Sequence, residues 1–157
     1  MHLHHISLIE RHVSNTQFIH LVRDGRDVVA SMHKVTHENP DVWGGERTIE
    51  ECLNRWTDDI ERTRRYVEEP GHHVVRYRDF ALDPDGILRI LCSALGVGHA
   101  EKMTEEYKEE AATVTLGFEE WKETSAEDIR YKGHQKFYRY FDERQREGIE
   151  STVSSYN

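Results

Sequence analysis

Residues 18–34, FIHLVRDGRDVVASMHK, join an apolar run to a charged turn and then to a second apolar stretch with helical spacing. This pattern predicts a strand, a tight turn and a helix. The apolar side chains of the first run are strand formers suited to burial on both faces of a parallel sheet: Phe18, Ile19, Leu21 and Val22. Val28, Val29 and Met32 are expected to pack back on that sheet.

The turn has the features of an anion site. Asp24 can cap the helix, Asp27 stands three residues on in capping-box position, and Gly25 permits a sharp turn or close approach of a ligand. Ligands of open α/β sheets bind beyond the carboxyl ends of strands, where a helix N-terminus beside guanidinium groups suits a phosphate. The alternative is a solvated structural turn, since charged strand–turn–helix units are common. The candidate ligand-binding side chains are Arg23, Arg26 and Ser31.

Composition limits the class of protein. A length of 157 residues predicts one domain, residues 1–157, with a real core. A formal charge of −9 argues against a general nucleic-acid or anionic-membrane binder, although basic residues can still gather locally around a small anion. The two cysteines, Cys52 and Cys92, fall in apolar helical patterns and are expected to be reduced and buried, as in a cytoplasmic protein. Neither a membrane span nor a signal-peptide core is visible.

Beyond the first helix, residues 37–47 are expected to form an exposed loop around Trp43. Thr48 and Glu51 form a capping box that opens a helix through about Glu69. The apolar stripe of this helix is expected to be core: Ile49, Leu53, Trp56, Ile60 and Val67.

Residues 73–77, HVVRY, predict a second strand, parallel to the first because the connection is a helical crossover. Asp83 and Pro84 then start a helix that Gly96 ends. Its expected buried side consists of Ile87, Leu88, Leu91, Cys92 and Leu95.

The last third is less regular. A polar helix is expected over residues 99–110 and an extended surface loop over 111–133. Asp142 is expected to cap a final helix that runs through about Val153 and has a thin apolar side.

The amino terminus begins at once with an amphipathic pattern, as though inside an element. His2, His4 and His5 could share a helix face and bind a metal, but no cysteine or carboxylate stands near them with a ligand spacing, so no metal site is assigned.

Two blocks resemble the sulfotransferase family, enzymes that use 3′-phosphoadenosine 5′-phosphosulfate (PAPS). FIHLVRDGRDVVASMHK is similar to the family's 3′-phosphate-binding segment, in which a strand-end arginine precedes a helix serine by eight residues, as Arg23 precedes Ser31 here. VVRYRDFALDPDGILRILCSALGV is similar to a second block, which implies that Tyr77 lies near the adenine. Lys132 and Gly133 resemble a segment that closes over the 3′-phosphate, although Tyr131 stands where cytosolic members have arginine.

The resemblance covers about residues 3–153 and implies a P-loop-NTPase-like sulfotransferase fold, α/β with a parallel sheet flanked by helices. Nothing in the chain matches the glycine-rich loop that holds the 5′-phosphosulfate, so the fold is expected to be incomplete at its N-terminal side, with a sheet edge that favours a homo-oligomer. In the family, the catalytic histidine lies before the arginine that binds the 3′-phosphate, which is Arg23 here. His2, His4 and His5 stand at about the family's spacing from Arg23, and the resemblance makes them candidate bases.

The resemblance therefore implies transfer of a sulfuryl group from PAPS to a hydroxyl or amine acceptor, with this chain carrying the 3′-phosphate-binding part and partnering a nucleotide and an unidentified acceptor. Without the 5′-phosphosulfate loop, the chain is expected to transfer sulfuryl groups much more slowly. The 3′-phosphate site adds binding energy for the nucleotide, but it does not stabilise the charge on the leaving phosphate. The alternative is a catalytically inactive nucleotide-binding or interaction domain that retains the fold. A nucleotide kinase-like domain is disfavoured because a Walker-type loop is missing.

Overall fold

The computed structural model describes residues 2–106 and 131–156, which fall into two compact units. The first unit comprises residues 1–77 and 132–157, and the second comprises residues 78–131. Among the described residues, no helix is both long enough and apolar enough to cross a membrane. The prediction of one domain over residues 1–157 stays a prediction.

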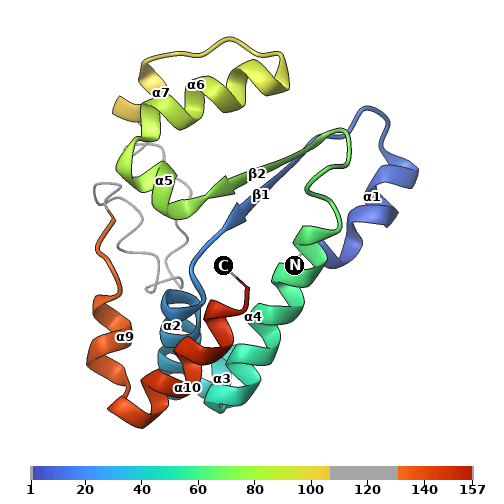
Figure 1. Cartoon of the computed structure of the whole chain (residues 1–157). Coiled ribbons are helices and arrows are strands. Elements are labelled where there is room, and N and C mark those ends of the chain that lie inside the picture. The colour runs from blue at the N-terminus through green and yellow to red at the C-terminus, as the bar shows by residue number, and fades with distance from the viewer. Residues whose placement is uncertain (1, 107–130, 157) are drawn as a thin grey trace. The chain divides into compact units, whose positions relative to one another are not determined.

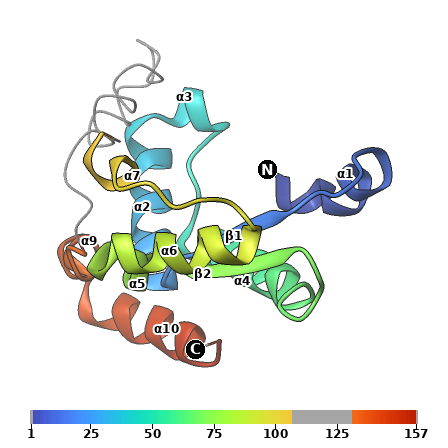
Figure 2. The ribbon, with the colours of Figure 1, turned by 90° about the horizontal axis from the view of Figure 1, so that it is seen from above.

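The first unit is a mixed α/β structure with a two-stranded parallel sheet flanked by helices, which is the predicted fold class (Figure 1). Its elements are η1 (His2–His5), α1 (Ile6–His12), β1 (Phe18–Val22), α2 (Gly25–Glu38), α3 (Pro40–Trp43), α4 (Ile49–Arg64), β2 (His72–Arg76), α9 (Gln135–Tyr140) and α10 (Glu143–Ser154). Helix α5 (Tyr77–Leu82) begins on the last residue of the unit's first segment. Figures 1 and 2 show α1 at the amino-terminal end of β1 and α9 beyond the carboxyl end of that strand (Figure 1, Figure 2).

The two strands pair in the predicted parallel sense, with Phe18 opposite His72 and Val22 opposite Arg76. Burial on both faces was a wrong prediction, because Ile19 and Leu21 are 51% and 59% exposed. Successive side chains of a strand point to opposite faces. The face with Phe18 and His72 is covered, whereas Ile19 and Leu21 occupy the other face.

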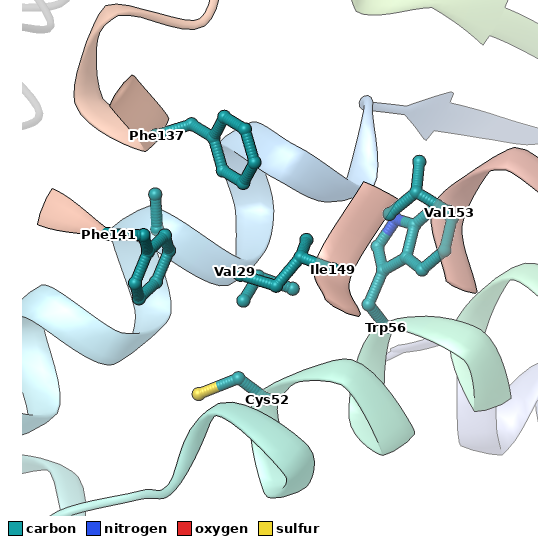
Figure 3. Packing of buried hydrophobic residues seen from close by; sticks show 8 residues of the cluster. Val29, Cys52, Trp56, Phe137, Phe141, Ile149 and Val153 are labelled. Atoms are coloured by element: carbon teal, nitrogen blue, oxygen red, sulfur yellow. The ribbon is translucent and has the colours of Figure 1, made fainter. Parts of the chain in front are cut away.

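The core of the first unit lies between helices. Buried side chains of α2, α4, α9 and α10, and of the residue that follows α9, converge there (Figure 3), namely Val29, Ala30, Cys52, Trp56, Phe137, Phe141, Ile149 and Val153. Val28 and Met32 pack against this cluster, so the expectation that they pack on the sheet is corrected. Ile149 and Val153, which form the predicted apolar side of α10, are almost fully buried, so this helix contributes to the core.

Gly25 has a packing role. It is the first residue of α2, its φ is not positive, and a Cβ there would lie 2.7 Å from Val153 Cγ2 and 2.8 Å from Trp56 Cε2. The turn therefore needs a residue without a side chain because α4 and α10 approach it closely. Gly25 is therefore required for close packing of helices, and its predicted role in ligand approach stays a prediction.

Local signals at the helix ends are confirmed. Asp24 caps α2 by accepting a hydrogen bond from the Arg26 backbone N–H, and Thr48 forms the predicted capping box with Glu51 at the start of α4. Asp142 caps α10 in a second box that includes Gln145. These ends are specified by residues two or three apart, so local sequence is sufficient to define them.

Other boundaries differ from the predictions. The expected loop over residues 37–47 contains the end of α2 and all of α3. Helix α4 ends at Arg64, so Val67 lies beyond the helix and is half exposed. Helix α9 was not predicted, because it occupies only six residues next to a segment without clear periodicity.

The second unit contains α6 (Pro84–Leu95), capped by Asp83 and ended by Gly96 in the left-handed conformation, as predicted. Cys92 is buried, whereas the other residues of the predicted buried side are only partly buried: Ile87, Leu88, Leu91 and Leu95. Within the predicted polar helix at 99–110, α7 covers only Lys102–Glu105, and residues 107–110 lie outside the described residues. Most of the predicted loop, residues 111–130, also lies outside them. Cys52 and Cys92 are free buried thiols, as expected.

Candidate anion site

The candidate site lies where both strands end. Val22 and Arg76 are register partners, so the next residue of each strand, Arg23 and Tyr77, also meet. The Arg23 guanidinium carbon lies 4.6 Å from the centre of the Tyr77 ring. This contact brings together two residues that the sequence had assigned to one nucleotide site from separate blocks.

Besides Tyr77, two further residues contact Arg23, namely Asp27 and Trp56. Its Nε lies 3.7 Å from Asp27 Oδ2, and the Asp27 side chain is only 6% exposed. Its backbone carbonyl accepts a 3.2 Å hydrogen bond from Trp56 Nε1, which connects the turn to α4. The Arg23 side chain itself is 44% exposed. An arginine that is held by these contacts and is still 44% exposed is suited to an anion from solvent.

Arg26 is engaged differently. Its Nε and Nη2 donate hydrogen bonds of 2.9 and 2.8 Å to the two carboxylate oxygens of Asp24. Burial opposes ionisation of Asp24, but the hydrogen bonds from Arg26 outweigh it and lower the Asp24 pKa. The same pair raises the Arg26 pKa. A ligand-binding role of Arg26 stays a prediction and would require competition with Asp24.

Ser31 is half-buried on α2. It stands four residues after Asp27 and three before Lys34, and side chains at these spacings share one helix face. Lys34 lies 3.3 Å from Glu38 and 5.8 Å from the centre of the Tyr140 ring. Hydrogen bonds with Glu38 and Tyr140 raise the Lys34 pKa.

The carboxyl-terminal segment reaches the same helix end. His134 Nδ1 lies 3.1 Å from Asp27 Oδ1, and His134 Nε2 lies 3.9 Å from Asp24 Oδ2. The two residues before it are Gly133, which has a φ of 62°, and Lys132, which is exposed. The contact between His134 and Asp27 therefore brings the predicted Lys132–Gly133 pair to the amino-terminal end of α2.

Lys136 adds a cation that sequence reasoning missed. Burial lowers the Lys136 pKa, and the charges of Lys34 and Arg23 lower it further. Lys132 acts in the same direction, and Asp27 opposes it only in part. The positive charges of Lys34, Arg23 and Lys132 that act on Lys136 make this a locally positive region on a chain of net charge −9.

Asp27 and His134 were also missed as site residues. Asp27 had been assigned to helix capping, although its carboxylate contacts Arg23 and His134. The signal for His134 was its position directly after the Lys132–Gly133 pair.

The amino-terminal histidines lie in η1. His4 Nε2 is 3.5 Å from Asp59 Oδ1 on α4, and His5 is exposed. The backbone of His2 belongs to η1, but its side chain lies outside what the structure describes. Within residues 2–106 and 131–156, no three His, Cys, Asp or Glu side chains gather closely enough to hold a metal. The role of these histidines as a catalytic base stays a prediction.

A second histidine cluster lies deeper in the sheet. His20 Nε2 and His72 Nδ1 share a 2.8 Å hydrogen bond, and His72 Nε2 lies 3.1 Å from Glu10 Oε1. Phe18 and Tyr66 stack on the His72 ring. Burial lowers the His20 pKa, and the neighbouring His72 lowers it further. This cluster borders a cavity of about 200 Å³ that His20, Phe18 and Thr63 help to line.

Residues 1–101 match the family model described as "Sulfotransferase family", which is more than half of the chain. The matched residues include both strands, Arg23, Ser31 and Tyr77. A search of curated proteins found no match.

Proposed function

The chain belongs to the sulfotransferase family, and on this premise we propose that it binds PAPS, with Arg23 and Ser31 holding the 3′-phosphate of the nucleotide. When bound, the donor supplies the sulfuryl group that moves to a hydroxyl or amine acceptor. The observation that carries the proposal is the setting of Arg23 directly after β1, where its guanidinium lies over the Tyr77 ring, its Nε lies 3.7 Å from Asp27 Oδ2 and its side chain is 44% exposed.

The residues present fit a phosphate. The Arg23 side chain is 44% exposed, and a planar guanidinium is suited to paired hydrogen bonds with phosphate oxygens. Ser31 offers a hydroxyl donor on α2, the helix that follows Arg23, and Lys132 brings a further positive charge. The amino-terminal end of α2 adds the positive end of a helix dipole.

This clamp acts on the remote end of the nucleotide. It supplies binding energy and orientation, whereas sulfuryl transfer also needs a base and stabilisation of the leaving phosphate. His2, His4 and His5 are the proposed candidates for the base. A sulfate-transfer assay of wild-type protein and His4→Ala separates an active enzyme from an inactive nucleotide-binding domain.

The nucleotide proposal is tested by calorimetry with 3′-phosphoadenosine 5′-phosphate and adenosine 5′-phosphate. Wild-type protein should bind 3′-phosphoadenosine 5′-phosphate more tightly than adenosine 5′-phosphate. Arg23→Ala should weaken binding of 3′-phosphoadenosine 5′-phosphate by at least about 1.5 kcal/mol, roughly tenfold in affinity, as for loss of a hydrogen bond to a charged group. Arg89→Ala is the matched control, because Arg89 is an exposed arginine that pairs with Asp85 on α6. Equal affinity of wild-type protein for the two nucleotides would overturn the proposal.

A further inference from the structure

The position of Tyr77 follows from the pairing of the sheet. Val22 and Arg76 end β1 and β2 as register partners, Arg23 follows Val22, and Tyr77 follows Arg76 as the first residue of α5. The guanidinium of Arg23 consequently lies over the ring of Tyr77, with 4.6 Å between its central carbon and the ring centre. Both residues belong to the first unit.

The contacts on Arg23 use different parts of the guanidinium. The central guanidinium carbon of Arg23 lies over the Tyr77 ring, and a cation–π contact of this kind uses none of the five N–H donors of the guanidinium as a hydrogen bond. Asp27 approaches through Nε, at 3.7 Å. The two terminal amino groups therefore remain suited to paired hydrogen bonds with a phosphate.

We propose that Tyr77 is a positioning residue, which sets the selectivity for a 3′-phosphate by holding the plane of the Arg23 guanidinium. This inference rests on the proposed function of Arg23. It differs from the role implied by sequence resemblance, in which Tyr77 contacts the adenine. A ring that stacks on Arg23 acts on the phosphate alone, whereas a ring that stacks on the base acts on every adenine nucleotide.

This difference defines the experiment. The affinities for 3′-phosphoadenosine 5′-phosphate and adenosine 5′-phosphate are measured by calorimetry for wild-type protein, Tyr77→Phe and Tyr77→Leu. Tyr77→Leu should lower the affinity for 3′-phosphoadenosine 5′-phosphate by about fivefold, which is within the range of an exposed cation–π contact. It should change the affinity for adenosine 5′-phosphate by less than about twofold, and Tyr77→Phe should retain both affinities because its ring remains.

A double-mutant cycle supplies a readout that a general loss of stability would not mimic. In the Arg23→Ala background, Tyr77→Leu should have no further effect on the 3′-phosphorylated ligand, since the group that it positions is gone. Tyr77→Met is measured in parallel, so that misfolding of one variant, checked by circular dichroism, leaves the comparison intact.

Two outcomes overturn the inference. Equal weakening of both nucleotides by Tyr77→Leu assigns the ring to the adenine, and unchanged affinity for both shows that the stack has no role in binding. Failure of the underlying proposal has a different signature, because wild-type protein would then fail to distinguish the two nucleotides before Tyr77 is changed.

Discussion

His134 Nδ1 lies 3.1 Å from Asp27 Oδ1, and this contact joins two residues 107 positions apart in the chain. Because Asp27 also contacts Arg23, a single buried carboxylate connects the strand-end arginine to the segment that carries Lys132 and Lys136. Asp27, at the start of α2, thus links Arg23 to His134, which lies in the segment that carries Lys132 and Lys136.

Replacement of Asp27 should destabilise the first unit. Asp27→Ala removes the carboxylate from Arg23 and His134, and loss of hydrogen-bond partners in a buried setting costs about 1–3 kcal/mol. The measurement is the free energy of unfolding in urea. Asp58→Ala, at an exposed position of α4, is the control and should change stability by less than about 0.5 kcal/mol. A similar small effect at Asp27 would contradict its structural role.

Two glycine-to-alanine substitutions should change the stability of the protein in opposite directions. Gly25→Ala places a Cβ against Val153 and Trp56, and such overpacking costs about 1–3 kcal/mol. Gly148→Ala meets no heavy atom within 4 Å and lies inside α10, so it should stabilise by about 0.5–1 kcal/mol through helix propensity. Thermal unfolding of both variants checks this, and a shift of the same sign in each would refute the close packing around Gly25.

Stability should fall on acidification below the ordinary histidine pKa. Burial, and then His72, lower the folded-state pKa of His20 below 6.5. The unfolded chain therefore binds more protons, so stability is complete above pH 6.5 and is lost as pH falls through the folded-state pKa. His33, whose pKa is lowered by burial and by His37, contributes with the same sign.

Urea unfolding between pH 5 and 8 measures this dependence. His20→Asn should flatten the curve, because it removes one of the two contributions. His5→Asn, at an exposed position, is the control and should leave the curve unchanged. If His20→Asn unfolds with the wild-type pH profile, the buried pair does not control this part of the stability.

Lys136 should contribute binding at a cost in stability. In the absence of an anion, Lys136→Gln removes repulsion from Lys34 and Arg23 and should raise the melting temperature. With 3′-phosphoadenosine 5′-phosphate present, the same variant should show a smaller ligand-induced rise in melting temperature than wild-type protein. Lys102→Gln, on α7 in the second unit, should alter neither quantity by a comparable amount. If 3′-phosphoadenosine 5′-phosphate raised the melting temperature of Lys136→Gln as much as that of wild-type protein, Lys136 would not be part of the binding site.

Much of the architecture was readable from local sequence. The strand–turn–helix around Arg23, the caps at Asp24, Thr48 and Asp142, and the parallel pairing of the strands were all predicted correctly. Each depends on residues a few positions apart or on the handedness of a helical crossover, and these determinants are local. Burial was less predictable, as the exposed Ile19 shows, because it depends on which elements cover a face.

The sequence alone determined where Arg23 and Ser31 stand, at the end of β1 and on the helix that follows, because alternation, capping and helical spacing operate within a few residues. Only the tertiary structure decided which groups surround them. Tyr77 reaches Arg23 through the strand register, and His134 reaches Asp27 across 107 positions. Contacts of this kind depend on how separate elements pack, and no pattern along one element specifies them.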